Sequence, residues 1–128
     1  MQVYYFTRTH HSEEIAQELG KRLGASVHEI KDTHDYQGPI GYLKAGRASL
    51  GKYTYQIQYD ALESGDLYLV FPIWAGSFPP AVRTFINKEG RARIILVPTS
   101  MGSILKDREG FKKVIDMPGK QAQLPDTL

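Results

Sequence analysis

Two short runs of almost entirely apolar residues constrain the fold of this chain more than any other feature. The first run covers residues 66–73 (DLYLVFPI), and the second covers residues 93–97 (RIILV). A strand with one face in water alternates apolar and polar residues, whereas a strand covered on both faces is apolar almost throughout. The two runs therefore predict central strands of a parallel sheet that has helices packed on both faces.

The N-terminal segment has the pattern of a strand, a helix and a second strand. Residues 3–6 are β-branched and aromatic, and residues 13–23 then carry apolar side chains four positions apart, the spacing of one helical face. Ser12 stands at the N-cap position of the predicted helix, and Gly24 stands where the helix should end. Residues 26–30 fit a returning strand, which completes a parallel βαβ unit.

Three further segments show helical patterns. Residues 79–86 begin with two prolines and carry an apolar face, which predicts a helix after the first apolar run. Residues 42–50 fit a short helix and residues 104–115 fit a last one, whereas residues 52–59 fit either an edge strand or an ordered loop. The alternation of strand and helix patterns predicts a doubly wound α/β fold.

The C-terminal segment has little pattern of its own. Beyond residue 115 the chain contains two prolines and at most one short strand, near residues 121–124. The sequence therefore does not decide whether the sheet has a fifth strand. It predicts that a covering C-terminal helix is missing. No internal repeat divides the chain, and we predict a single domain over residues 1–128.

Composition and charge exclude several kinds of function. The 128 residues include no cysteine, so disulfides, thiolate metal sites and cysteine nucleophiles are excluded, and any redox chemistry needs a bound cofactor. A net charge of +2 with scattered lysines and arginines indicates no nucleic-acid surface. Neither a signal peptide nor an apolar stretch of roughly 18 residues is present, so we expect a cytoplasmic protein without membrane contact. No spacing indicates a Ser–His–Asp site, a pair of catalytic carboxylates or a metal site.

Ligands of open parallel sheets bind where loops leave the carboxyl ends of the strands, and three loops of this chain are candidates. The first, residues 7–12, offers the hydroxyls of Thr7, Thr9 and Ser12 beside the backbone N–H groups of a helix start. A helix start carries partial positive charge and unsatisfied donors, which suits a phosphate dianion. The alternative is that Ser12 is only an N-cap and the threonines are ordinary strand-end residues.

The second candidate loop, residues 73–78, contains the single tryptophan of the chain beside small residues. Trp74 can offer a flat platform to a planar heterocycle, or it can pack as an ordinary core residue. The third candidate loop, residues 99–103, is small and polar and by itself indicates only a turn and a helix cap. Arg83, in the predicted helix after the second loop, is expected on the helix surface.

Taken together, the three loops resemble those of the flavodoxin family, in its broad sense of short FMN-binding proteins. The family's phosphate loop reads Ser/Thr-x-Thr-Gly-Asn-Thr, and residues 7–12 (TRTHHS) occupy its place. Residues 41–46 (GYLKAG), 72–76 (PIWAG) and 79–85 (PPAVRTF) look like segments of uncharacterised bacterial flavodoxin-like proteins. The resemblance covers about residues 2–115 and implies an open parallel sheet with the strand order 2-1-3-4-5.

The resemblance also implies FMN as the cofactor and a site divided among the three loops. Hydroxyl and backbone N–H groups of the first loop would hold the phosphate, Trp74 with Ile73 and Ala75 would flank the isoalloxazine ring, and residues 99–103 would face its pyrimidine edge. The residues predicted to bind the cofactor are Thr7, Arg8, Thr9, His10, His11, Ser12, Pro72, Ile73, Trp74, Ala75, Gly76, Thr99, Ser100, Met101, Gly102 and Ser103.

Three features depart from the family pattern. His10 stands in place of the family's glycine, and its β-carbon costs about 1 kcal/mol or more if that position needs a positive φ, which lowers the expected affinity for FMN. His10 and His11 can instead protonate below about pH 6.5 and bind the phosphate, or they are simply solvated. The chain is slightly basic where the family's electron carriers are acidic. Because the C-terminus is short, we expect one face of the sheet to be uncovered, so that a second copy of the chain or another partner can pack on it.

The sequence thus predicts an FMN-binding redox protein. It would be either an electron carrier that serves a redox partner protein or a small NAD(P)H-dependent reductase, for example of quinones. The alternative is a non-flavin module of the same fold that binds a protein partner or another phosphate ligand, because a fold does not fix a function. His10 and the short tail motivate that alternative.

Overall fold

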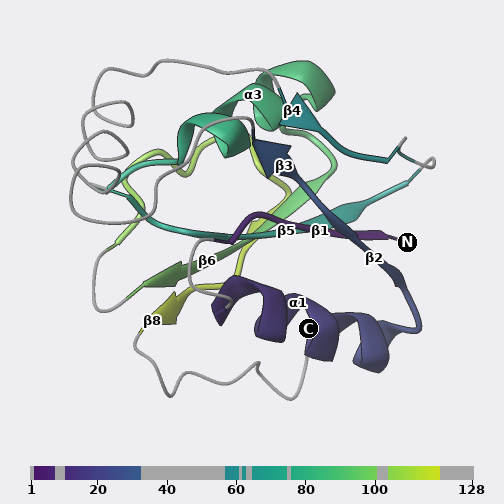
Figure 1. Ribbon diagram of the computed structural model, residues 1–128. Helices are drawn as coiled ribbons and strands as arrows, with labels where there is room; N and C mark the ends of the chain where they lie inside the picture. The colour runs from purple at the N-terminus through teal and green to yellow at the C-terminus, as the bar shows by residue number, and fades with distance from the viewer. Residues whose placement is uncertain are drawn as a thin grey trace.

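The computed structural model of the protein describes residues 2–7, 11–32, 57–60, 62, 65–74, 76–100 and 104–118 (Figure 1). The helix predicted at residues 42–50 and the strand predicted near residues 121–124 lie outside these ranges. In chain order the described elements are β1 (Gln2–Tyr5), α1 (His11–Leu23), β2 (Ser26–Glu29), β3 (Lys31–Asp32), β4 (Ile57–Gln58), β5 (Leu67–Pro72), α3 (Pro80–Glu89), β6 (Ile94–Ser100), β7 (Lys113–Val114) and β8 (Met117–Pro118).

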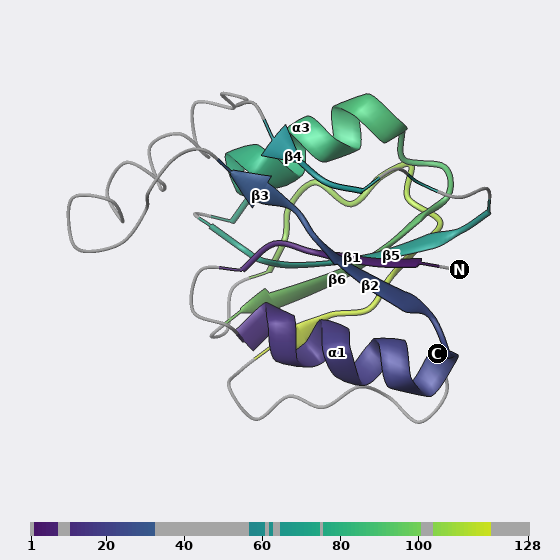
Figure 2. The same ribbon diagram turned by 45° about the vertical axis from the view of Figure 1, so that its right-hand side comes forward.

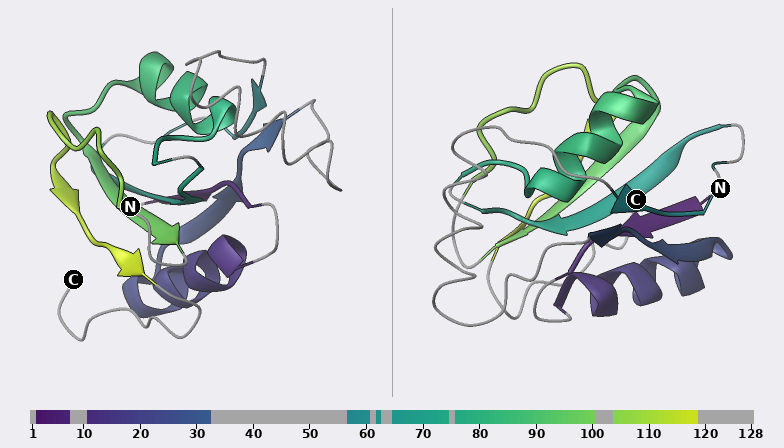
Figure 3. Two further views of the ribbon diagram at one scale, coloured as in Figure 1. Left: turned by 90° about the vertical axis from the view of Figure 1, so that its left-hand side faces the viewer. Right: turned by 45° about the horizontal axis from the view of Figure 1, so that its top comes forward.

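A parallel sheet forms the centre of the molecule. Its strands lie in the order β2-β1-β5-β6-β7, and β8 also pairs with β6. Every pairing in this sheet is parallel. The order is the predicted 2-1-3-4-5, with β5 and β6 as the third and fourth strands. The fifth position is shared by β7 and β8, which run along the edge of the sheet beside β6 (Figure 3).

Helices cover both faces of the sheet, as the two apolar runs predicted. α1 packs on one face and α3 on the other (Figure 2). Side chains of β5 alternate between the two cores: Leu67, Leu69 and Phe71 lie on the α3 side, and Tyr68 and Val70 lie on the α1 side. All five side chains are buried. This two-sided burial explains why the run is apolar throughout.

The helix predicted from the N-terminal apolar stripe is confirmed as α1. Its buried residues include Ile15, Ala16 and Leu19, which pack against the sheet. Gly24, with a φ of 61°, ends the helix as predicted. The helix begins at His11, however, so Ser12 lies in its first turn and the predicted N-cap position for Ser12 is wrong.

α1 approaches β2 more closely than any side chain on Gly20 would permit. A β-carbon built on Gly20 would lie 2.4 Å from Cγ2 of Val27 and 3.2 Å from the backbone oxygen of Ala25. Glycine lowers the stability of a helix interior by roughly 0.5–1 kcal/mol relative to alanine. The close packing of α1 on β2 explains its presence here.

A second, small sheet lies beside α3. β3 and β4 pair antiparallel, with Lys31 opposite Gln58. Of the two interpretations of residues 52–59, the strand is therefore the correct one at residues 57–58, and residues 52–56 lie outside the described residues.

The helix predicted at residues 104–115 is wrong. Residues 104–112 form turns and irregular backbone, and the short strands β7 and β8 follow. Backbone N–H groups of Lys112 and Ile115 donate to carbonyl oxygens of β6, at 3.0 and 2.8 Å. Two ion pairs, Arg91–Asp107 and Lys112–Asp66, also fasten the segment to distant residues. A third, Arg108–Asp116, joins residues close together in the sequence. These long-range contacts outweigh the local helical pattern.

Candidate functional site

The carboxyl ends of β1, β5 and β6 lie side by side at one edge of the sheet. Tyr5 is in register with Val70, and Pro72 is in register with Thr99. The three predicted ligand loops therefore leave the sheet from adjacent positions. The chain continues from β1 to its neighbour on one side, β2, and later returns to β5 on the other side of β1. Ligands of doubly wound sheets bind at such a reversal of strand order. We use the name carboxyl edge for the carboxyl ends of β1, β5 and β6 together with the described residues that follow each of these strands.

The structure describes part of the predicted site. The described residues are Thr7, His11, Ser12, Pro72, Ile73, Trp74, Gly76, Thr99 and Ser100. The other predicted residues lie outside the described ranges, and they are Arg8, Thr9, His10, Ala75, Met101, Gly102 and Ser103.

A buried hydrogen bond joins the first and third loops. Oγ of Ser12, in the first turn of α1, lies 3.1 Å from Oγ1 of Thr99, near the end of β6. The two residues are 2% and 3% exposed. Thr99 also donates from Oγ1 to the carbonyl oxygen of Phe71, at 3.3 Å. The start of α1 is therefore held against both β5 and β6.

The direction of these hydrogen bonds follows from the number of hydroxyl protons. Thr99 has one hydroxyl proton, and the Phe71 carbonyl can only accept. When Thr99 donates to the Phe71 carbonyl, its oxygen accepts a hydrogen bond from the Ser12 hydroxyl. Both hydroxyl protons are then used within the protein. In this arrangement Ser12 and Thr99 fix the geometry of the edge, and the direct phosphate contact predicted for Ser12 stays a prediction.

The start of α1 also carries acidic side chains. Glu13 and Glu14 lie in its first turn, and the Tyr5 hydroxyl donates to Oε1 of Glu13 at 3.3 Å. Burial, together with the carboxylates of Glu29 and Glu13, raises the pKa of Tyr5 to about 12. The acidic residues stabilise the helix through its macrodipole. They also compete with an external anion for the positive helix start.

The second loop is a closed turn built around Trp74. Backbone N–H groups of Trp74 and Ser77 each donate to the carbonyl oxygen of the other, at 3.0 and 2.9 Å. The Trp74 ring packs edge-on against Phe6, with 5.5 Å between ring centres, and the residue is 9% exposed. In the described part of the chain Trp74 is thus a core residue. Its predicted place beside a flavin ring stays a prediction.

Gly76 allows this turn to close. Its φ of 72° lies in the left-handed region, and a β-carbon there would lie 3.4 Å from Cε of Lys106. The carbonyl oxygen of Gly76 accepts a hydrogen bond from the N–H of Lys106 at 3.2 Å, and the N–H of Ile73 donates to the carbonyl of Thr99 at 2.9 Å. The second and third loops are therefore fastened together through the backbone.

Arg83 supports the same turn from α3. Contrary to the surface position expected from the sequence, Arg83 is half-buried and donates from Nη2 to Oγ of Ser77 at 2.7 Å. Its guanidinium lies 5.6 Å from the centre of the Phe78 ring. Burial lowers the pKa of Arg83, and the carboxylate of Asp107 opposes that effect. The sequence signal was weak, because Arg83 follows the start of the helix by one turn and fits an exposed position equally well.

Two kinds of feature do not occur in the described part of the chain. No helix there is long and apolar enough to cross a membrane. No group of three or more histidine, aspartate or glutamate side chains there is arranged to hold a metal ion.

Comparison with known proteins supports the architecture. No protein-family model and no curated protein matches the sequence. Solved structures do match the fold, among them the following three. A flavoprotein from Lactobacillus acidophilus, crystallised in complex with FMN, is 16% identical with a TM-score of 0.71, over 90% of this chain and 89% of that one. A protein from Bacteroides uniformis assigned as a flavoprotein is 24% identical with a TM-score of 0.72, over 92% and 89% of the two chains. A third, from Bacteroides eggerthii, is 21% identical with a TM-score of 0.71, over 91% and 86%.

These similarities confirm the predicted fold class. The chain has a doubly wound, flavodoxin-like α/β fold, with a parallel sheet between helices. At such low sequence identity the similarity concerns the fold, and a fold alone does not fix a function.

Proposed function

We propose that this protein binds FMN at the carboxyl edge and that the bound FMN gives it a redox function. The observation that carries the proposal is the buried Ser12–Thr99 hydrogen bond, which ties the start of α1 to the end of β6 at the reversal of strand order. A flavoprotein of similar fold binds FMN in its crystal. When bound, FMN supplies hydride and single-electron transfer, which the side chains of this cysteine-free protein lack.

The donors available at the carboxyl edge suit the two ends of FMN. The phosphate would bind the backbone N–H groups of residues 8–12 and the Thr7 hydroxyl, because a helix start favours an anion. Ser12 and Thr99 would act by holding that helix start in position. The isoalloxazine ring would lie against Ile73, Trp74 and Gly76, where Trp74 pairs with Ser77 through the backbone and the Gly76 carbonyl accepts from the N–H of Lys106.

The electron source decides between two forms of this function. As an electron carrier the protein would receive electrons from a redox partner protein, and as a reductase it would receive a hydride from NAD(P)H. Steady-state oxidation of NAD(P)H by the FMN-loaded protein, with a quinone as acceptor, separates the two. Turnover above the rate of free FMN supports the reductase, and no turnover supports the carrier.

Reconstitution tests the proposal. Protein mixed with FMN and desalted should remain yellow, with quenched flavin fluorescence and a shifted visible spectrum. Thr99→Val removes the bond to Ser12 at nearly constant volume, and we expect it to weaken FMN binding about tenfold, or about 1.4 kcal/mol. Thr84→Val is the matched control, because the Thr84 hydroxyl bonds the carbonyl of Pro80 within α3. No binding at FMN concentrations on the order of tens of micromolar would contradict the proposal.

A non-flavin module is the second candidate, and two observations favour it. Trp74 is largely covered by the core, and Glu13 and Glu14 lie in the first turn of α1. This candidate predicts a colourless protein that is indifferent to FMN and elutes as a defined homo-oligomer or partner complex. Size-exclusion chromatography with and without FMN distinguishes it from the flavoprotein.

A further inference from the structure

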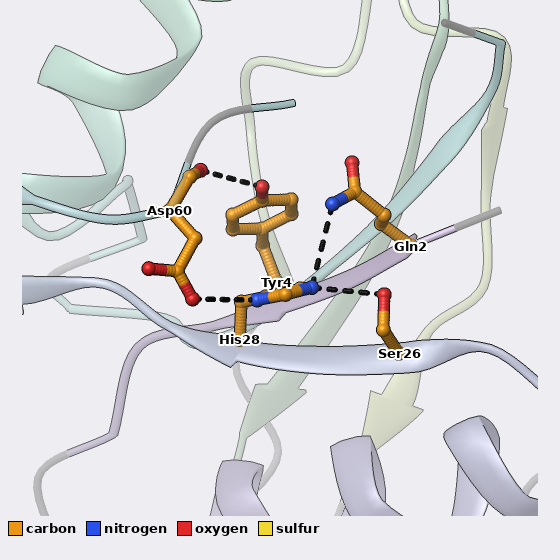
Figure 4. A network of polar contacts seen from close by, with 5 residues as sticks. All are labelled: Gln2, Tyr4, Ser26, His28 and Asp60. Carbon is orange, nitrogen blue, oxygen red and sulfur yellow. Dashed lines mark hydrogen bonds and ion pairs between the residues drawn. The ribbon is translucent and has the colours of Figure 1, made fainter. Parts of the chain in front are cut away.

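A polar network at the opposite end of the sheet brings together a serine, a histidine and an aspartate (Figure 4). Nδ1 of His28 lies 2.8 Å from Oδ2 of Asp60, and Nε2 of His28 lies 2.8 Å from Oγ of Ser26. Ser26 and His28 are alternate residues of β2, and Asp60 follows β4. Ser26 pairs with Gln2 at the amino ends of the strands. The network is therefore separate from the carboxyl edge.

The two nitrogens of His28 have the partners that a general base needs. A carboxylate only accepts, so Asp60 accepts a hydrogen bond from Nδ1–H, which fixes the neutral ring in the tautomer whose Nε2 carries the lone pair. Nε2 then accepts a hydrogen bond from the hydroxyl of Ser26. Nucleophile, base and orienting carboxylate thus follow each other in the order that activates a serine.

The packing of His28 preserves this arrangement. The imidazole stacks on the ring of Tyr4, with centres 5.1 Å apart and planes at 25°. The buried Tyr4 also donates from its hydroxyl to the backbone oxygen of Asp60, at 2.7 Å. One core side chain therefore supports both the base and the segment that carries the carboxylate. The His28 side chain is 18% exposed, whereas Ser26 is exposed, so the base is covered and the nucleophile is accessible.

Gln2 supplies an amide donor next to the reacting atoms. Its Nε2 lies 3.3 Å from Nε2 of His28, and the residue is buried. The unprotonated His28 nitrogen has one lone pair, so the Gln2 N–H and the Ser26 hydroxyl share it as a single acceptor. Gln2 thereby helps to hold the imidazole beside Ser26.

Beside His28 and Asp60 the surface is hollowed. The hollow has a volume of about 420 Å³ and is open to solvent, and its lining includes His28, Tyr59 and Asp60. Ser26 itself is not in this lining, which begins at the next residue of β2, Val27. A hollow that opens to solvent beside the serine would take small esters with a good leaving group.

We propose that Ser26 is a nucleophile that takes the acyl group of small activated esters, with His28 as general base and Asp60 as a positioning residue. The Ser26 oxygen bonds the acyl carbon while His28 takes its proton, the ester C–O bond breaks, and His28 passes that proton to the leaving alcohol. Water then adds to the acyl carbon with its proton moving to His28, the Ser26–acyl bond breaks, and the proton returns to Ser26. No electrons are exchanged, and FMN takes no part.

Hydrolysis of p-nitrophenyl acetate by the full chain tests this proposal. We expect release of p-nitrophenolate and, in a quenched sample, an acetyl group on the peptide that contains Ser26. Ser26→Ala and His28→Gln should each lower the protein-dependent rate about 100-fold, within the usual range for general-base catalysis. Thr84→Ala removes a hydroxyl that donates to the carbonyl oxygen of Pro80 in α3, and it should leave the rate unchanged.

The positioning role of Asp60 is tested by comparing two substitutions that a purely structural role would not distinguish. Asp60→Asn should lower the rate by at least about tenfold, and Asp60→Glu should restore part of it. Circular dichroism and thermal melting of each variant exclude unfolding as the cause. A rate that survives Ser26→Ala, or acetylation at other residues only, would overturn the proposal. Repeating the assay with saturating FMN should give the same rate, so its outcome is independent of the proposed flavin site.

Discussion

The connection from β1 to β2 leads to a neighbouring parallel strand, and so does the connection from β6 to β7, but apolar burial and ion pairs contribute to them in different proportions. The first contains α1, whose Ile15, Ala16 and Leu19 are buried against the sheet. The second contains residues 104–112, which are irregular; it buries Leu105 and is fastened by the ion pairs Arg91–Asp107 and Lys112–Asp66. Apolar burial in a helix leaves a periodic pattern in the sequence. Ion pairs between distant residues leave none.

The largest expected effect is at the α1 connection. Leu19 is fully buried, and truncation of a buried leucine to alanine destabilises proteins by about 2–5 kcal/mol. Leu19→Ala should therefore lower the free energy of unfolding in urea by that amount. Because the effect is apolar, it should be nearly the same at low and high salt. A loss below about 1 kcal/mol would show that α1 contributes little to the core.

The next largest expected effect is a change of stability with pH that comes from Tyr5, whose hydroxyl donates to Glu13 in α1. Its pKa of about 12 in the folded protein lies above the ordinary value of 10.0, so between these values the unfolded chain has lost a proton that the folded chain keeps. Stability therefore falls as pH rises through this window, by up to about 2–3 kcal/mol. Tyr5→Phe should remove that part of the alkaline loss. Equal slopes of stability against pH for both proteins would contradict it.

Gly20→Ala tests the close packing of α1 on β2. The new β-carbon would meet Cγ2 of Val27 at 2.4 Å, and overpacking of this kind costs about 1–3 kcal/mol. Gln17→Ala, at an exposed position of α1, is the matched control and should be neutral within about 0.5 kcal/mol. Thermal melting of both variants measures the difference. A stabilised Gly20→Ala protein would mean that the two elements can separate without loss.

The smallest expected effect is at the β6–β7 connection. Arg91 and Asp107 form a bidentate pair at 2.7 Å, with about a third or more of each side chain exposed. Asp107→Asn should lower stability by no more than about 1 kcal/mol, and the difference from the original protein should shrink at about 1 M salt. A loss as large as that of Leu19→Ala would remove the contrast between the two connections.

The sequence predicted the elements whose evidence is local. Burial of Leu67 to Phe71 on alternate faces of the sheet explains the apolar run. The apolar stripe predicted α1 correctly, and Pro79 and Pro80 correctly marked the start of α3. Residues 104–115 were mispredicted because their apolar positions mimic a helical period, while their partners lie in other parts of the chain.

The sites were less predictable, because they join residues far apart in the sequence. Ser12 and Thr99 are 87 positions apart, and His28 and Asp60 are 32 positions apart. Topology alone indicated that the loops after β1, β5 and β6 would meet. Nothing local indicated that two hydroxyls would bond each other there, or that Ser26, His28 and Asp60 would form a network.

Comparison of FMN with riboflavin is the most direct test of the account, because the two ligands differ only in the phosphate that the start of α1 is proposed to bind. Titration of the protein with each flavin, followed by fluorescence quenching, gives both dissociation constants. We expect FMN to bind at least about tenfold more tightly than riboflavin, or by about 1.4 kcal/mol. Equal affinities, or no binding of FMN, would contradict a flavin phosphate site at the carboxyl edge.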